Sequence, residues 1–151
     1  MSYDAMVFDP EAAPRNKGEF LRWYGEQTEW SDERSYDDPA ITTPALRNLF
    51  LDMIKTFPAM NGPYAGDDVD DPRLTDYSIG TSVIYAGFAW SMADEAYKTM
   101  YEMAMKHGIG FYNASGSDDE IFFPVNGELV PIKKLKASEG GSRPKWKFWQ
   151  S

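Results

Sequence analysis

The stretch Val83-Ile-Tyr-Ala-Gly-Phe-Ala-Trp90 is the most strand-like part of this chain of 151 residues. Both sets of alternating positions along it are apolar, which is the pattern of a strand covered on both of its faces. A turn or bulge at Gly80-Thr81 separates it from an extended segment at residues 77–79. We therefore expect this stretch to be a central strand of a sheet.

The clearest helix lies upstream of that strand. Thr43 is suited to cap its start, and Pro44 occupies the first helical position, where the missing N–H costs nothing. An apolar stripe follows at helical spacing and ends before Pro58. Its members are Leu46, Leu49, Phe50, Met53, Ile54 and Phe57. A long loop rich in proline, glycine and aspartate is expected at residues 58–75.

Two further helices are indicated by capping patterns. Asn16 and Glu19 resemble a capping box in front of a helix at residues 17–28. Ser91 and Asp94 suggest a second box, which would start a helix that ends near Gly108. The only histidine, His107, falls in the last turn of that helix on its apolar stripe, so we expect it to have a structural role.

The remaining strands complete a single α+β domain at residues 1–136. They are expected at residues 3–8, 109–113, 120–125 and 129–132, and Asn126-Gly127 is a strong signal for a hairpin between the last two. We expect a mixed or mainly antiparallel sheet of four to six strands, with three helices packed mainly on one face. Residues 137–151 are interpreted as a flexible basic and aromatic tail.

Charge is distributed unevenly along the chain, whose formal net charge is -9. Residues 133–151 contain six basic residues and one acid, a charge of +5, which leaves -14 for residues 1–132. The negative charge of residues 1–132 repels the phosphate backbone of nucleic acid. We therefore expect this acidic body not to bind nucleic acid. It would attract a basic protein partner, although acidic surfaces also serve solubility alone.

Several classes of protein are disfavoured by what the sequence lacks. There is no cysteine, which excludes disulfides, iron–sulfur clusters and thiol catalysis. No stretch approaches the roughly 18 apolar residues of a membrane span, and the first residues lack the features of a secretory signal, so we expect a cytoplasmic protein. Hydrolase and nucleotide-binding motifs are absent, and we predict no cofactor and no catalytic residues.

The candidate partner-binding residues are acids and loop aromatics. Aromatic side chains surrounded by acids suit a binding face for a basic protein. The acids are Asp67, Asp68, Asp70, Asp71, Asp118, Asp119 and Glu120, and the aromatics are Trp30, Tyr36 and Tyr64. A calcium or magnesium site would need oxygen ligands that converge from a pinned loop, and the spacing of these acids does not match an EF-hand. A solvated acidic loop is the simpler interpretation, and no metal ligand is assigned.

The last residues of the sequence combine basic and aromatic side chains. Lys145-Trp-Lys-Phe-Trp149 interleaves basic and aromatic residues, a pattern that suits contact with a membrane surface or with nucleic acid. A frayed end is another interpretation. We favour docking of this segment on the acidic body of the protein itself, because the charges are complementary.

Several segments together resemble a group of small acidic bacterial proteins of uncharacterised function. They include Ser2-Tyr-Asp-Ala-Met-Val-Phe8, Trp23-Tyr-Gly-Glu-Gln-Thr-Glu-Trp30, Phe57-Pro-Ala-Met-Asn-Gly-Pro63, Thr75-Asp-Tyr-Ser-Ile-Gly80, Ile84-Tyr-Ala-Gly-Phe-Ala-Trp-Ser91 and Lys106-His-Gly-Ile-Gly-Phe111. The resemblance covers about residues 2–124. In size, acidity and lack of catalytic motifs the chain is also similar to immunity proteins, which neutralise toxins of bacterial competition systems.

These observations lead to one main hypothesis and two alternatives. The main hypothesis is a non-enzymatic, immunity-type inhibitor that occludes a basic toxin domain through its acidic face. The first alternative is a small hydrolase that depends on carboxylates or a metal. The second is a structural or regulatory module that self-associates, for instance by placing the tail on the acidic body of a neighbour. The oligomeric state and the partner are left open.

Overall fold

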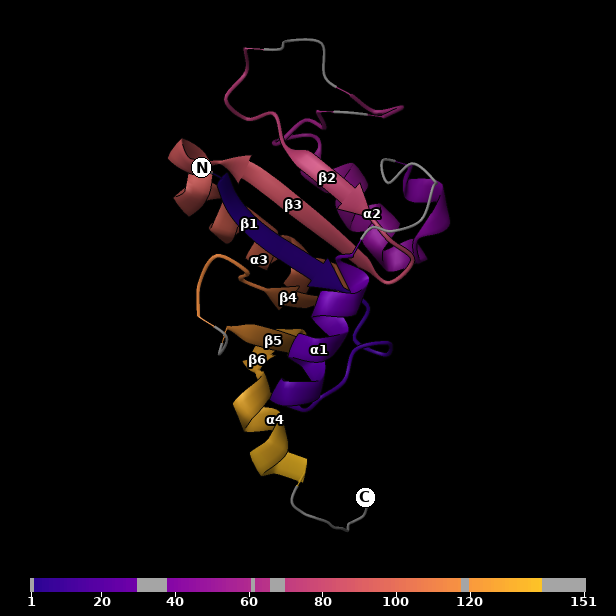
Figure 1. Ribbon diagram of the computed structural model, residues 1–151, viewed down its shortest axis with the longest axis vertical. Coiled ribbons are helices and arrows are strands. Elements are labelled where there is room, and N and C mark those ends of the chain that lie inside the picture. Colours follow the sequence, from indigo (N-terminus) through magenta and orange to yellow (C-terminus); the bar gives the residue numbers. More distant parts are fainter. Residues whose placement is uncertain (1, 30–37, 61, 66–69, 118–119, 140–151) are drawn as a thin grey trace.

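The computed structural model describes residues 2–29, 38–60, 62–65, 70–117 and 120–139, which contain six strands and four α-helices (Figure 1). The strands are β1 (Ser2–Phe8), β2 (Asp76–Ile79), β3 (Val83–Ala89), β4 (Gly110–Tyr112), β5 (Ile121–Val125) and β6 (Glu128–Pro131). The helices are α1 (Lys17–Gln27), α2 (Pro44–Met53), α3 (Ala93–His107) and α4 (Ile132–Glu139), with short 3-10 helices at Pro39–Ile41 and Trp90–Met92. The predicted α+β fold class is confirmed.

The strands form one antiparallel sheet in the order β2-β3-β1-β4-β5-β6. The first strand of the chain therefore lies inside the sheet, where Met6 is opposite Tyr85 of β3 on one side and Tyr112 of β4 on the other. β3 lies between β2 and β1, so the interior position predicted for residues 83–90 is confirmed for Val83–Ala89, whereas Trp90 begins a 3-10 helix.

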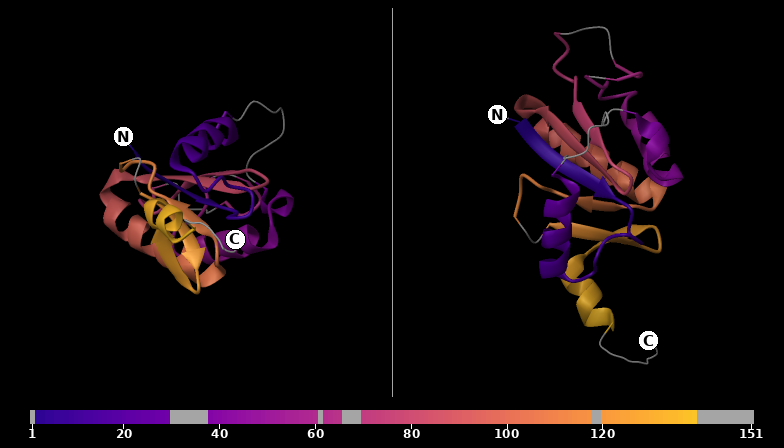
Figure 2. Two further views of the ribbon diagram at one scale, coloured as in Figure 1. Left: turned by 90° about the horizontal axis from the view of Figure 1, so that it is seen from below. Right: turned by 45° about the vertical axis from the view of Figure 1, so that its right-hand side comes forward.

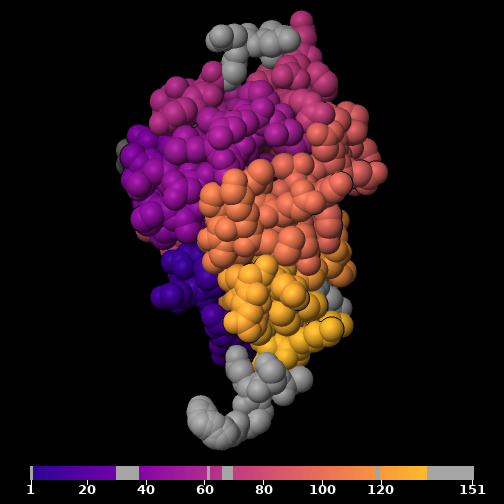
Figure 3. Space-filling model, turned by 180° about the vertical axis from the view of Figure 1, so that it is seen from behind, coloured from indigo at the N-terminus to yellow at the C-terminus, as the bar shows by residue number. Residues whose placement is uncertain are grey.

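Helices cover both faces of the sheet, so the expectation that they pack mainly on one face is wrong. α2 and α3 pack on one face, and Figure 3 shows their side chains forming one continuous surface there. α1 lies on the opposite face, as Figure 2 shows, and buries Phe20 against Phe8 with ring centroids 4.9 Å apart. The reason is that Met6, Phe8 and Val83 are apolar residues on the α1 face, whereas Val7 and Ile84 are apolar residues on the other face, and both groups are buried.

Local signals determine most of the element boundaries. The amide of Leu46 donates to Thr43 Oγ1 at the start of α2, and the amide of Glu19 donates to Asn16 Oδ1 at the start of α1. Asn126 and Gly127 both have positive φ, as the hairpin requires. The capping box predicted at Ser91 and Asp94 is wrong: α3 follows Met92 without a side-chain cap, because a 3-10 turn leads into it.

α4 was not predicted. It runs through the predicted domain boundary at residues 136/137, and its buried residues Ile132 and Leu135 extend the apolar cluster under α1. Figure 1 shows α4 continuing beyond β6, away from the rest of the sheet. Among the residues that the structure describes, no helix is both long and apolar enough to cross a membrane.

Candidate functional site

An open groove of about 590 Å³ lies on the face of the sheet that carries α1. Figure 1 shows that this helix lies over the part of the face beside β4 and β5 and leaves β2 and most of β3 uncovered. The floor of the groove is formed by β1, β2 and β3, and one wall is formed by the segment that precedes β2. The residues that line it are Ser2, Asp4, Met60, Asp71, Pro72, Leu74, Asp76, Ser78, Tyr85, Gly87, Phe88 and Ala89.

The alternation of the strands explains why the floor is polar. Along β3, Ile84, Ala86 and Phe88 belong to the core under α2 and α3, so Tyr85 and Gly87 lie on the groove side. The same alternation buries Tyr77 and Ile79 of β2. The residues between the buried ones on β1 and β2 are Asp4, Asp76 and Ser78, which therefore line the groove.

The register places two carboxylates on either side of a glycine. Gly87 of β3 is opposite Asp4 of β1 and also opposite Asp76 of β2. A Cβ atom added at Gly87 would lie 3.4 Å from Asp4 Oδ1 and 4.0 Å from Asp76 Cβ, both ordinary contacts. The absence of a side chain at residue 87 therefore leaves a gap between the two aspartates.

The wall of the groove is anchored to the body of the protein. The amide of Thr75 donates to the carbonyl of Pro58, and the amide of Met60 donates to the carbonyl of Thr75, both at 2.9 Å. The guanidinium of Arg73 lies within 2.8 Å of both carboxylate oxygens of Glu95 on α3. These contacts hold Met60 and Asp71 beside the floor, with Met60 48% exposed.

The groove is acidic. The lining residues that the structure describes include three aspartates and no lysine, arginine or histidine. Asp4 accepts hydrogen bonds from Ser2 Oγ at 2.8 Å and from the Tyr85 hydroxyl at 2.9 Å. Burial, together with the hydrogen bond to Asp4, raises the pKa of Tyr85, so its phenol stays protonated and donates. Such a site attracts cationic groups and hydrogen-bond donors.

No metal centre is indicated in the described part of the chain. Within residues 2–29, 38–60, 62–65, 70–117 and 120–139, no group of three or more histidine, aspartate or glutamate side chains is arranged to hold a metal ion.

The predicted binding residues are only partly brought to this groove. Asp71 lines it, and Asp70 is the exposed residue that precedes Asp71. Six of the predicted residues lie outside the described residues: Trp30, Tyr36, Asp67, Asp68, Asp118 and Asp119.

Glu120 and Tyr64 lie apart from the groove lining. Glu120 accepts from Asn113 Nδ2 and from the Ser117 amide, both at 3.1 Å, so both of its carboxylate oxygens are engaged in the loop between β4 and β5. The Tyr64 ring is 46% exposed and packs edge-on against Phe50 of α2, with centroids 5.9 Å apart.

The main groove residues were missed at the sequence level. Asp4 and Asp76 are single aspartates in short strands, and neither belongs to an acidic cluster. Gly87 was interpreted only as part of an apolar strand. Trp90 directly follows the groove residue Ala89 and is 53% exposed, although its position at the end of an apolar run suggested burial.

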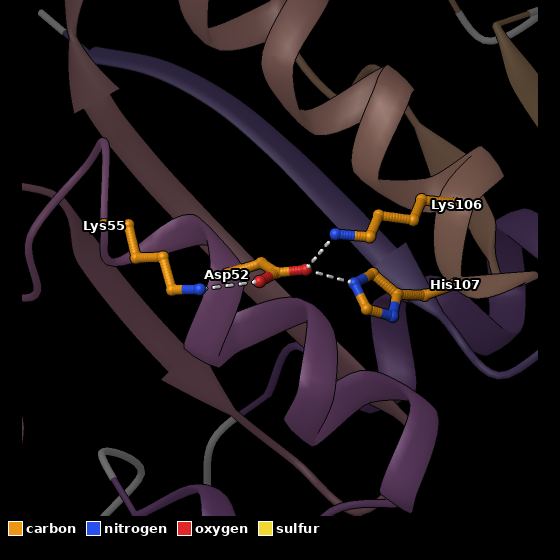
Figure 4. A network of polar contacts seen from close by, with 4 residues as sticks. All are labelled: Asp52, Lys55, Lys106 and His107. Atoms are coloured by element: carbon orange, nitrogen blue, oxygen red, sulfur yellow. Dashed lines mark hydrogen bonds and ion pairs between the residues drawn. The ribbon is translucent and has the colours of Figure 1, made fainter.

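A second polar cluster joins α2 to α3 (Figure 4). Asp52 Oδ2 lies 2.9 Å from Lys106 Nζ and 2.7 Å from His107 Nε2, and Asp52 Oδ1 lies 3.3 Å from Lys55 Nζ. Hydrogen bonds from Lys106 and His107 hold the pKa of Asp52 well below its ordinary value. Both lysines are largely exposed, whereas His107 is 15% exposed. This cluster fixes the packing of the two helices.

The fold and the groove thus define an α+β protein with an acidic groove on an open sheet face. Comparison of the chain with protein-family models, with curated proteins and with solved structures finds no match. The function is therefore argued from the residues of this chain.

Proposed function

We propose that this chain is a non-enzymatic, cytoplasmic protein that binds a basic segment of a partner protein in its acidic groove. One observation carries the proposal: Asp4, Asp71 and Asp76 line an open groove, and no basic residue is found among the lining residues that the structure describes. Carboxylates gathered in a concave surface favour the approach of a cationic partner.

The lining also suits contact with protein rather than with free ions alone. Met60 and Leu74 give the wall an apolar character, while Ser78 and the Tyr85 hydroxyl add polar groups to the floor. An apolar surface next to charged groups is typical of protein interfaces, in which apolar contacts hold the partner and charges orient it.

We further propose that the partner is a basic toxin domain and that binding blocks its active site, as in an immunity-type inhibitor. The charge of -14 on residues 1–132 supports this version, because it extends the attraction well beyond the groove. The similarity in size and acidity to immunity proteins supports it as well. Inhibition would be steric and electrostatic, and association would slow as salt rises.

The proposal is tested by capture of partners from the native host with three baits. The first bait is the wild-type chain, and the second carries Asp4→Asn and Asp76→Asn. The third carries Glu102→Gln and Glu128→Gln, two exposed carboxylates outside the groove lining, so its net charge matches that of the second. A stoichiometric basic protein retained by the first and third baits and lost from the second supports the proposal. Equal retention by all three baits overturns it.

A further inference from the structure

We infer that the groove of one copy binds the C-terminal segment, residues 140–151, of a second copy of this chain. The inference rests on the same interpretation of the groove as the proposed function, and it goes beyond it by identifying a ligand. In this arrangement the protein occupies its own binding site until a basic partner displaces the segment.

The chemistry of the segment complements that of the groove. Residues 140–151 contain Arg143, Lys145 and Lys147 and no acid. When extended, Lys145-Trp-Lys-Phe148 presents its two lysines on one side and its two aromatic rings on the other. The groove offers the matching pair of surfaces, with Asp4 and Asp76 on the floor and apolar side chains on the wall.

The topology favours a second copy over the same chain. α4 follows β6, and four strand steps of about 4.8 Å separate β6 from β3, a distance of roughly 19 Å. The eight residues of α4 add about 12 Å in the direction away from the groove (Figure 1). The groove centre is therefore roughly 30 Å from the end of α4.

A fully extended chain covers about 3.4 Å per residue, so Lys145, six residues after Glu139, reaches only about 20 Å from the end of α4. Lys147 reaches roughly 27 Å on the same basis, and only along a straight path through the body of the protein. Lys145 thus falls short of the groove in its own chain, and Lys147 would come near it only along that straight path, which the protein body occupies. A neighbouring molecule has no such restriction.

The test uses a synthetic peptide of residues 140–151 as the probe. It is titrated into the full-length chain carrying Lys145→Glu and Lys147→Glu, whose own segment no longer competes. We expect saturable binding that weakens about tenfold or more when Asp4→Asn and Asp76→Asn are added, because two attracting charges are lost. Adding Glu102→Gln and Glu128→Gln instead provides the control of equal charge and should leave affinity within about twofold.

The peptide with Lys145 and Lys147 replaced by glutamate gives the second control, and it should not bind. The inference is overturned if the wild-type peptide fails to bind, if it binds the groove variant equally well, or if it binds only to vesicles of anionic lipid. The last result would identify the segment as a membrane contact.

Sedimentation of the full-length wild-type chain supplies an independent readout. We expect self-association that grows with protein concentration and is reduced by either the groove pair or the lysine pair of substitutions. A monomer at all concentrations contradicts the inference. If the peptide fails to bind while the groove variant still loses its basic partner, the inference fails and the proposed function stands. If the peptide binds but the groove variant still retains its basic partner, the proposed function fails and the inference stands.

Discussion

Asp4 of β1 and Asp76 of β2 lie opposite the same residue, Gly87 of β3, although they are far apart in the sequence. Two like charges share one face of the sheet, with no side chain between them. Like charges on a sheet face oppose folding weakly, so the pairing of these two carboxylates has a cost to stability, which hydrogen bonds from Ser2 and Tyr85 offset in part at Asp4. We therefore attribute it to binding, and this separation of roles can be tested.

Asp76→Asn is expected to slow association with the basic partner and to leave thermal stability unchanged or slightly raised. The carboxylate of Asp76 makes no hydrogen bond or ion pair within the described part of the chain, so its loss removes attraction without removing a contact. Association rates measured at increasing salt should converge for the variant and the wild type, because salt screens the charge. Glu128→Gln is the control, and a variant that melts several degrees lower would contradict the prediction.

Gly87→Val is expected to block the groove while the sheet keeps its stability. The added Cβ meets Asp4 Oδ1 and Asp76 Cβ at ordinary contact distances, and valine suits a strand better than glycine does. The two methyl groups would fill the gap that a cationic side chain needs. Partner affinity should fall about tenfold or more, and unfolding in denaturant should show no loss of stability. Unchanged affinity would show that nothing binds in this gap.

Gly110→Ala is expected to destabilise the protein by about 1–3 kcal/mol, because the core has no room for one more carbon. Its Cβ would lie 2.2 Å from the ring of Phe8, which is fully buried against Phe20 and Phe123. Gly25→Ala is the matched control, since nothing lies within 4 Å of its added Cβ. That change in α1 should stabilise by about 0.5–1 kcal/mol. Equal effects of the two substitutions in denaturant titrations would be inconsistent with this packing.

The Asp52 cluster predicts a specific pH dependence of stability. Hydrogen bonds from Lys106 and His107 hold the folded-state pKa of Asp52 below its ordinary value of 3.8. The charged Asp52 carboxylate therefore has its full stabilising effect at pH values above 3.8. The effect is lost as pH falls from there toward the folded-state pKa. Asp52→Asn should cost about 1–2 kcal/mol at pH 7, and the difference from the wild type should shrink between pH 5 and pH 2.

Unfolding free energies measured across that range check the prediction, with Asp76→Asn as the control for loss of an aspartate. A difference between Asp52→Asn and the wild type that stays constant down to pH 2 would mean that the cluster does not stabilise the folded state.

The fold was predictable where the signal is local. The Thr43 cap, the apolar stripe of α2 and the Asn126-Gly127 turn each lie within a few residues, and each is confirmed. α4 was missed because its described buried positions, Ile132 and Leu135, give too short an apolar pattern next to a basic segment. α1 was predicted as a helix, but its position on the second face of the sheet was missed, because periodicity does not tell which face of a sheet a helix covers.

The groove was harder to predict for a related reason. Sequence reasoning favours clusters of charge, and it selected Asp70 and Asp71 because they lie among other aspartates. Asp4 and Asp76 come together only through the pairing of β3 with both β1 and β2, and no local pattern reports that register. Of the predicted residues that the structure describes, Asp71 alone lines the groove.

The interior position of β1 also sets the timing of folding during synthesis. This strand is synthesised before its two neighbours in the sheet, which begin at Val83 and Gly110. β1 can therefore pair with β3 and β4 only after most of the domain has been translated, and such long-range strand pairing is slow. Until then the nascent chain exposes the apolar, aggregation-prone β1 segment. The yield of folded protein should therefore depend on chaperones and on the rate of translation.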